Sequence, residues 1–178
     1  MKKTLVVARY KENVDWVQLW ADLGWHVNIV EKEGPQGIGN WGRESGSYLH
    51  FIVKNYGELS GLYSFCQGDP YAHSSRFAPM IINPGFYAGF CKCDIFGLPD
   101  HWEKLDIPGA WKSLFGVYED EDSARPPEEL YFSPGAQFLV HAGKLKSRPY
   151  SFWERILNFC KDDPQAPWIM ERLWPSII

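Results

Sequence analysis

The sequence predicts an α/β domain in which an open, Rossmann-like sheet is flanked by helices. A short apolar run at 4–8 has the composition of a buried strand, the pattern over 13–23 is that of an amphipathic helix, and a second strand follows at 27–29. Strand, helix and strand in this order imply a parallel pair joined by a right-handed crossover. A length of 178 residues fits one such domain, so 1–178 is expected to form a single unit.

The first helix has predicted signals at both ends. Asn13 is placed as its N-terminal cap and Gly24 as the residue that ends it. Its apolar face is expected to comprise Val14, Val17, Trp20 and Leu23. In the strand that follows, Val27 and Ile29 alternate with polar neighbours, which is typical of a strand with one covered face.

A glycine-rich loop and a second helix lead to the third predicted strand. The segment 34–42 is typical of a loop whose backbone can approach a ligand closely, but it lacks the spacing of a dinucleotide or P-loop fingerprint. A helix is predicted over 44–56, with Tyr48, Leu49, Ile52 and Tyr56 on one face. The run 62–66 is the third strand, and Gln67-Gly68-Asp69-Pro70 follows its carboxyl end, where sites in open α/β sheets form.

The second half of the chain is expected to add further elements to the same domain. Residues 73–86 are predicted to form a loop, and the acidic, proline-containing segment 119–127 is expected to lie in solvent. The predicted regular elements are a strand at 86–93, a helix at 108–115 that begins with proline, a strand at 137–141, a helix at 149–160 and a terminal helix at 166–173.

Composition narrows the classes of partner. The chain has 18 basic and 22 acidic residues, a net charge of -4, and therefore no electrostatic signature of a protein that grips a phosphate backbone. We expect no affinity for nucleic acid. Aromatic residues make up 16% of the chain, including nine tryptophans, and aromatic faces are suited to packing against sugar rings.

Cysteine spacing and hydropathy predict a cytoplasmic protein. The four cysteines, Cys66, Cys91, Cys93 and Cys160, lack the spacing of a structural zinc site and are expected to be free thiols in a reducing compartment. The apolar run at 4–8 is too short for a signal-peptide core, and no run approaches the length of a membrane span.

Four blocks of sequence carry a resemblance to a known family. In chain order they are Val6-Val7-Ala8-Arg9-Tyr10-Lys11-Glu12-Asn13, Gly42-Arg43-Glu44-Ser45 with Tyr48-Leu49, Phe65-Cys66-Gln67-Gly68-Asp69-Pro70 with His73, and Gly135-Ala136-Gln137-Phe138 with Glu171-Arg172-Leu173-Trp174. Together they cover almost the whole chain and resemble a glycosyltransferase-like family of unknown function from bacteria, fungi and viruses. The wider similarity is to the GT-A glycosyltransferases. It implies a GT-A-like sheet and the transfer of a sugar from a nucleotide-sugar donor to an acceptor that the sequence does not identify.

The resemblance implies a donor half that follows the first and third strands. GT-A enzymes carry a metal-binding Asp-x-Asp after a central strand, and the matching position here is Gln67-Gly68-Asp69, without the first aspartate. That pair matters because a divalent cation bridges the donor phosphates and stabilises the departing nucleotide diphosphate. Asp69 and His73 are the expected ligands for manganese or magnesium, one carboxylate fewer than the class uses. The implied donor-binding residues are Arg9, Asn40, Arg43, Gln67 and Asp69.

The acceptor half is implied by the last block. The turn at 133–137 leads to a strand, and Glu171 follows between two tryptophans. An inverting transfer needs a carboxylate within hydrogen-bond reach of the acceptor hydroxyl, and Glu171 is the implied base. In a retaining enzyme Glu171 would instead orient the sugar or the acceptor. The implied acceptor contacts are Gly135, Gln137 and Trp174.

Several alternatives stay open on the sequence alone. Arg43 could pair with a donor phosphate or with Glu44. Asp120-Glu121-Asp122 is the one literal Asp-x-Asp of the chain, although it lies in the acidic segment expected in solvent. The fold could also belong to an inactive nucleotide-sugar or carbohydrate-binding module, or to a glycosidase that uses Asp69 and Glu171 as its carboxylate pair.

Overall fold

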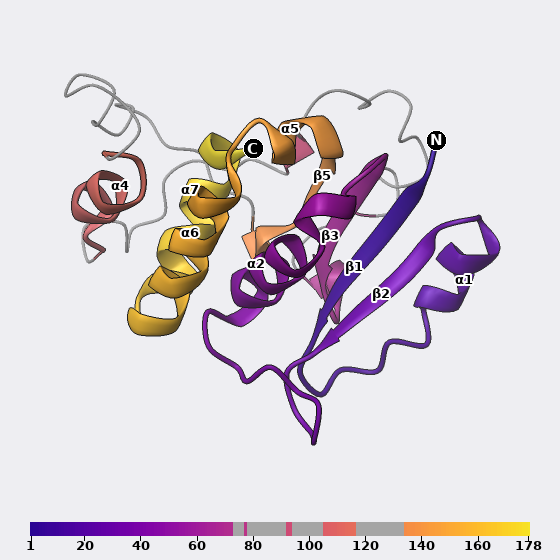
Figure 1. The fold of residues 1–178 in the computed structure, drawn as a ribbon. Coiled ribbons are helices and arrows are strands. Elements are labelled where there is room, and N and C mark those ends of the chain that lie inside the picture. The colour runs from indigo at the N-terminus through magenta and orange to yellow at the C-terminus, as the bar shows by residue number, and fades with distance from the viewer. Residues whose placement is uncertain (73–76, 78–91, 94–104, 117–133) are drawn as a thin grey trace.

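One mixed sheet organises the chain, in the strand order β2-β1-β3-β5-β4 (Figure 1). The computed structural model describes residues 1–72, 77, 92–93, 105–116 and 134–178. The strands are β1 (Lys3–Arg9), β2 (His26–Glu31), β3 (Leu62–Gln67), β4 (Lys92–Cys93) and β5 (Phe138–His141). The predicted strands at 4–8, 27–29, 62–66 and 137–141 are therefore confirmed. Of the strand expected at 86–93, only the two residues of β4 are among those described.

Strand direction changes across the sheet. β1 pairs in parallel with β2 on one side and with β3 on the other, as in the pairs Val7↔Ile29 and Val7↔Cys66. β5 runs antiparallel to β3, and β4 antiparallel to β5. The centre of β1 is completely buried, as its unbroken apolar run predicts for a strand covered on both faces.

Helices cover both faces of this sheet (Figure 1). The larger core packs α2 (Arg43–Asn55), α6 (Tyr150–Asp162) and α7 (Ala166–Ile177) against the face that carries Val6 and Phe65. α4 (Ile107–Phe115) joins the same core through its buried apolar residues. On the opposite face Trp20 of α1 (Val17–Asp22) packs with Leu5 and Val7. The described elements thus form a single α/β domain, as the sequence predicts.

The connections from β1 create a topological switch point. The chain passes from β1 through α1 to β2 on one side, and then through α2 to β3 on the other side of β1. The two crossover helices lie on opposite faces of the sheet. In open α/β sheets a crevice forms outside the carboxyl ends of the strands at such a point. The ends of β1 and β3 are therefore the place where this fold favours a site.

Two helices differ from their predicted bounds. The helix expected over 13–23 is confined to α1, and Asn13 does not cap it: the Asn13 Oδ1 atom accepts a hydrogen bond from the Asp15 N–H at 2.7 Å and closes a turn. Leu23 is 52% exposed, so it does not belong to the apolar face. Gly24 ends the helix at a φ of 81°, as predicted. The terminal helix continues beyond its predicted end, to Ile177, and includes Trp174.

The other predicted helices are confirmed, and one helix was not predicted. The predicted helices at 44–56, 108–115 and 149–160 correspond to α2, α4 and α6. α5 (Ala142–Lys146) was not predicted, because its five residues are too few to show a helical period. None of the helices in the described ranges has the length and apolar character needed to cross a membrane.

Candidate active site

A cleft of about 390 Å³ opens at the carboxyl ends of β1 and β3. Four segments contribute to it: the turn after β1, the start of α2, the turn after β3, and the contact between α7 and the short turn η5 (Pro134–Ala136). Its lining residues are Glu12, Arg43, Glu44, Gln67, Asp69, Ala72, Gly135 and Glu171. The cleft therefore lies at the switch point that the topology creates.

The cleft brings together residues from both halves of the predicted site. Arg43, Gln67 and Asp69 come from the predicted donor set, and Gly135 and Glu171 from the predicted acceptor set. Asp69 is exposed, whereas only 22% of the Glu171 side-chain surface is accessible to solvent. Donor and acceptor chemistry must meet within one cleft, and this arrangement satisfies that requirement.

Glu12 is a cleft residue that the sequence analysis did not select. Its Oε2 atom accepts hydrogen bonds from the backbone N–H groups of Tyr10 at 2.7 Å and Lys11 at 3.1 Å. Burial raises the pKa of Glu12, but these hydrogen bonds and the charge of Lys32 outweigh it, so the pKa lies below its ordinary value. Glu12 follows β1 as Asp69 follows β3, and this common placement was the available signal.

Glycine at position 68 makes room for the Glu12 carboxylate. A Cβ atom on Gly68 would lie 2.6 Å from Glu12 Oε2, which is closer than real contacts allow. The Glu12 carboxylate thus rests against the backbone of the residue that precedes Asp69. The cleft contains a second carboxylate beside the Gln67-Gly68-Asp69 turn, although the first aspartate of an Asp-x-Asp is absent there.

These residues fit a cation that binds together with its substrate. Across the described ranges, no group of three or more His, Cys, Asp or Glu side chains is arranged to hold a metal ion. Magnesium sites in phosphoryl-handling proteins commonly use one or two carboxylates together with the substrate phosphates, rather than a complete protein cage. Glu12 and Asp69 supply those two carboxylates. His73, the other expected ligand, lies outside the described residues, as does Asp120-Glu121-Asp122.

Arg43 begins α2 in a strained conformation. Its φ is 47°, and the preceding Gly42 has a φ of 62°, so two successive residues are left-handed. A residue other than glycine is uncommon in this region. The Arg43 guanidinium lies over the Trp168 ring at 4.8 Å from its centroid. Glu44, the alternative partner of Arg43, instead forms an ion pair with the buried Lys32 at 3.4 Å.

Gly135 and Glu171 connect the turn before β5 to α7. The Gly135 N–H donates a hydrogen bond of 2.6 Å to Glu171 Oε1. Gly135 has a φ of 69°, and Ala136, directly after it, has a φ of 52°. The Oε2 atom of Glu171 lies 3.6 Å from the guanidinium of Arg172, whose pKa is lowered by burial and raised by Glu171, with burial the larger effect.

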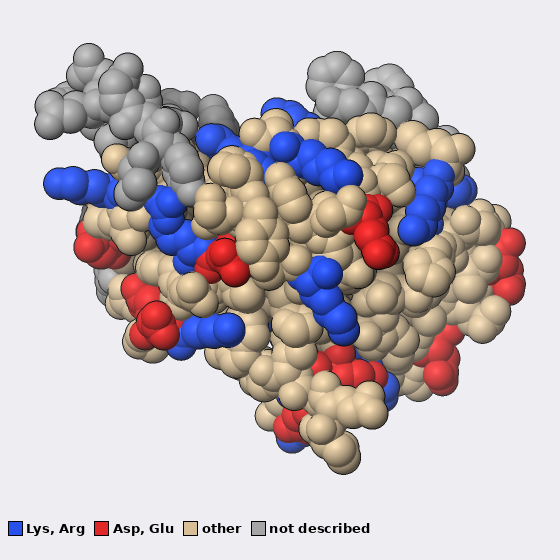
Figure 2. All heavy atoms as spheres, viewed as in Figure 1, with Lys and Arg blue, Asp and Glu red and all other residues tan. Residues whose placement is uncertain are grey.

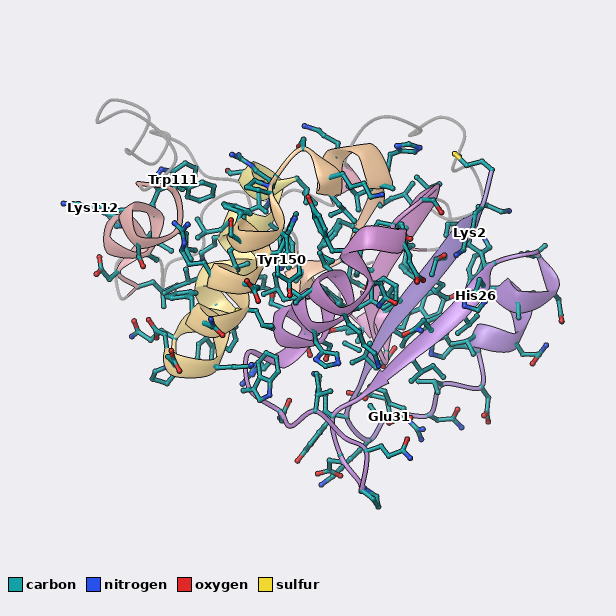
Figure 3. All side chains as sticks on the ribbon, viewed as in Figure 1. Lys2, His26, Glu31, Trp111, Lys112 and Tyr150 are labelled. Atoms are coloured by element: carbon teal, nitrogen blue, oxygen red, sulfur yellow. The ribbon has the colours of Figure 1, made fainter. Side chains whose placement is uncertain are left out.

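Two predicted donor contacts lie outside the cleft lining. Arg9 donates to the Glu12 backbone carbonyl at 3.0 Å and to Glu31 Oε1 at 2.9 Å. Figure 3 labels Glu31 at the carboxyl end of β2. Arg9 therefore supports the turn that carries Glu12. Asn40 borders a neighbouring hollow that shares Arg43 with the cleft.

Two predicted acceptor contacts are buried, which corrects the sequence interpretation. Gln137 is 2% exposed and donates through Nε2 to the Pro70 carbonyl at 2.9 Å, so it fixes the turn after Asp69. Trp174 lies within α7, on the side of the helix that packs into the core, and is fully buried. Its Nε1–H donates to Ser45 Oγ at 2.8 Å, and its ring packs against Phe138. Neither side chain is among those that line the cleft.

The cleft is acidic. Four carboxylates, from Glu12, Glu44, Asp69 and Glu171, face one guanidinium, from Arg43. Two of these carboxylates already face basic side chains, since Glu44 pairs with Lys32 at 3.4 Å and Glu171 lies 3.6 Å from Arg172. A divalent cation would offset the remaining negative charge toward a diphosphate. Outside the cleft, neither sign of charge dominates the surface in view. Figure 2 shows basic and acidic side chains interspersed over the described part of that face.

Comparison of the chain with protein-family models, with curated proteins and with solved structures finds no match.

Proposed function

We propose that the protein is a glycosyltransferase that moves a sugar from a nucleotide-sugar donor to an acceptor hydroxyl. The observation that carries this proposal is the meeting of Asp69 and Glu171 in one cleft at the switch point of the sheet. Asp69 follows β3 and Glu171 lies in α7, so segments far apart in the sequence supply the two carboxylates.

Glu12 and Asp69 would hold manganese or magnesium together with the donor phosphates. When bound, the cation offsets the charge of the diphosphate and stabilises it as a leaving group. Arg43 contributes the one positive side chain of the cleft lining, at its border with Trp168. Its planar guanidinium is suited to a phosphate oxygen pair.

Glu171 acts as the base. Its carboxylate takes the proton of the acceptor hydroxyl while the hydroxyl oxygen forms a bond to the anomeric carbon of the sugar. The bond from that carbon to the diphosphate oxygen breaks, and its electron pair leaves with the nucleotide diphosphate. The Gly135 N–H fixes one oxygen of Glu171, and the Arg172 guanidinium lies 3.6 Å from the other.

Backbone strain supports a functional role for the same surface. Arg43 and Ala136 are the two residues other than glycine with positive φ in the described ranges. Both line a small hollow of about 60 Å³ that also includes Glu171. Such conformations cost on the order of 1–3 kcal/mol each and tend to cluster at active sites, where the surrounding structure maintains them.

Turnover with a panel of nucleotide sugars and manganese tests the proposal. We expect release of nucleotide diphosphate with at least one donor, and a loss of at least about a hundredfold in kcat for Glu171→Gln, the order of magnitude of general base catalysis. Glu58→Gln is the matched control, because Glu58 is an exposed carboxylate outside the cleft lining. Unchanged turnover in Glu171→Gln would reject the role of Glu171.

Two other outcomes would identify a different function. Binding of a nucleotide sugar with no transfer to any acceptor indicates an inactive binding module. Release of free sugar from an oligosaccharide, without any nucleotide, indicates a glycosidase that uses Asp69 and Glu171.

A further inference from the structure

A second hollow, of about 360 Å³, adjoins the cleft on the far side of Arg43. It lies between the loop before α2 and the segment that joins α6 to α7. Its polar and aromatic lining includes Asn40, Trp41, Lys161, Asp162, Asp163 and Trp168. None of these residues takes part in the transfer described above.

The second hollow shares wall residues with the candidate active site. The small hollow of about 60 Å³ shares Arg43 and Glu171 with the cleft, and it shares Arg43 and Trp168 with the second hollow. The three hollows therefore adjoin one another in a row from Glu171 past Trp168 to Trp41, and this row is called the groove below. A molecule that presents a hydroxyl to Glu171 would extend along this groove.

We propose that this groove binds the acceptor, and that the acceptor is a neutral oligosaccharide of at least two sugar units. This inference rests on the proposed function, because it assigns the acceptor of the same site. Trp168 is the aromatic platform next to Glu171, and the second hollow holds the sugar units that follow.

Aromatic surface is the first feature that favours a sugar. Trp168 is 38% exposed, and the other described tryptophans are buried or half-buried. The Trp41 ring is fixed by a 2.6 Å hydrogen bond from its Nε1–H to the Ile38 carbonyl. Tryptophan offers a large apolar face with little conformational entropy to lose, which suits the apolar face of a sugar ring.

Charge is the second feature. In the second hollow, Arg43 and Lys161 are balanced by Asp162 and Asp163, whereas the cleft sets four carboxylates against one guanidinium. A balanced lining gives no electrostatic preference for a polyanion or a polycation. Carboxylates, an amide and an ammonium group together offer both acceptors and donors, as the hydroxyls of a neutral sugar require.

The two basic side chains are held against the two tryptophans. Arg43 lies 4.8 Å from the centroid of the Trp168 ring, and the Lys161 ammonium lies 5.3 Å from that of Trp41. Cation–π contacts of this kind orient both partners. Each ring is thereby fixed beside a hydrogen-bond donor, so the groove presents an ordered sequence of apolar and polar contacts.

Saturation-transfer NMR with neutral trisaccharides tests this inference, with glucose-, mannose-, galactose-, xylose- and N-acetylglucosamine-based probes and the matching monosaccharides. We expect at least one trisaccharide to bind at least about tenfold more tightly than its monosaccharide. Trp168→Ala should weaken its binding by at least about tenfold, and Trp168→Phe should restore much of it, because an aromatic face remains.

Tyr150→Ala is the control, since Tyr150 is an exposed aromatic residue (42%) at the start of α6 and outside the groove (Figure 3). It should bind the trisaccharide as the wild type does. Absence of trisaccharide binding, binding that Trp168→Ala leaves unchanged, or preference for a peptide or a lipid vesicle would overturn the inference.

The same samples separate this inference from the proposed function. Titration of the wild type with uridine and guanosine diphosphates and manganese reports on the donor half alone. Diphosphate binding without trisaccharide binding removes the oligosaccharide acceptor and leaves the transferase proposal. Trisaccharide binding that depends on Trp168, without diphosphate binding, retains the groove and removes the transferase.

Discussion

Arg43 and Ala136 adopt backbone conformations that cost stability, and both lie at the candidate site. Each adopts a positive φ directly after a glycine that also does so, and both border the groove beside Glu171. Arg43 contacts Trp168 at the groove, whereas Ala136 is also buried in the core. The strain at Arg43 is therefore the one most directly linked to the groove.

Arg43→Gly tests this strain against Arg43→Ala. Both substitutions remove the contact with Trp168, but only glycine relieves the φ of 47°. We expect Arg43→Gly to be the more stable of the two by about 1 kcal/mol, although glycine is ordinarily the less stable residue in a helix. Urea unfolding measures the difference, and equal stabilities would show that position 43 is not strained in solution.

Glu12 gives a pH-dependent prediction. Its folded-state pKa lies below the ordinary value of 4.5, so the stability contributed by its ionised form is complete above pH 4.5 and is lost as the pH falls through the folded-state pKa. Glu12→Gln should therefore lower the free energy of unfolding by about 1 kcal/mol near pH 6, and by progressively less below pH 4.5. Urea unfolding between pH 3 and 7 checks this.

The matched control for that series is Glu58→Gln, because it makes the same change at an exposed carboxylate outside the cleft lining. A stability difference for Glu12→Gln that persists undiminished at pH 3 would contradict the two backbone hydrogen bonds assigned to the Glu12 carboxylate.

Gly68 gives a prediction about steric coupling. An alanine Cβ there would meet the Glu12 carboxylate at 2.6 Å, so Gly68→Ala should destabilise the protein by about 1–2 kcal/mol. In a Glu12→Gly background the cost should largely disappear, because the Oε2, Cδ and Cβ atoms of Glu12 that the new Cβ would meet are all gone. A double-mutant cycle measures this coupling, and additive costs for the two substitutions would contradict the contact.

The sequence identified five residues of the cleft lining and missed Glu12. Asp69 was accessible because it follows the third predicted strand, and Arg43 was implied by the resemblance. Glu12 follows β1 in the same way, but it lies beside Asp69 only because β1 and β3 are neighbours in the sheet, and strand order is a tertiary property. Trp174 was assigned to the acceptor by the resemblance, and the sequence did not show that α7 buries its side chain.

Among the elements, α7 contributes the Glu171 side chain to the cleft lining. It carries Glu171 toward the cleft and Trp174 into the core, where the Trp174 indole donates to Ser45 of α2. The hydrogen bond joins the two helices that supply Arg43 and Glu171. A buried polar pair of this kind fixes the relative position of the helices.

Trp174→Phe should act on stability and not on ligand contacts. Loss of the buried hydrogen bond and of ring volume should lower the free energy of unfolding by about 2–3 kcal/mol. Affinity for a nucleotide diphosphate with manganese should stay within about twofold of the wild type at temperatures where the variant is folded. Calorimetric unfolding and titration together check this, and a large loss of affinity without a loss of stability would return Trp174 to the site.

Buried strands and long helices were the elements that the sequence predicted well. β1, β3 and α2 carry continuous or periodic apolar residues that are buried in the core. α1 is shorter than predicted because the Asn13 side chain closes a turn instead of capping a helix. The antiparallel direction of β5 was not predicted, because strand direction depends on the route of the chain between strands.

At the scale of the whole molecule, topology explains why these residues meet. β1 lies between β2 and β3, and the two crossover helices, α1 and α2, cover opposite faces of the sheet. The turns that follow β1 and β3 therefore share one crevice, which α7 and the turn before β5 close from the side. Under the proposed function, a divalent cation offsets the acidic lining of this crevice when a diphosphate binds.

Isothermal titration of nucleotide diphosphates and nucleotide sugars, with and without manganese, tests this account most directly. We predict that at least one nucleotide binds only when manganese is present, and that Asp69→Asn and Glu12→Gln each weaken its binding by at least about tenfold. Absence of nucleotide binding in the presence of manganese, or binding that neither manganese nor Asp69→Asn alters, would contradict the assignment of the cleft to a nucleotide-sugar donor.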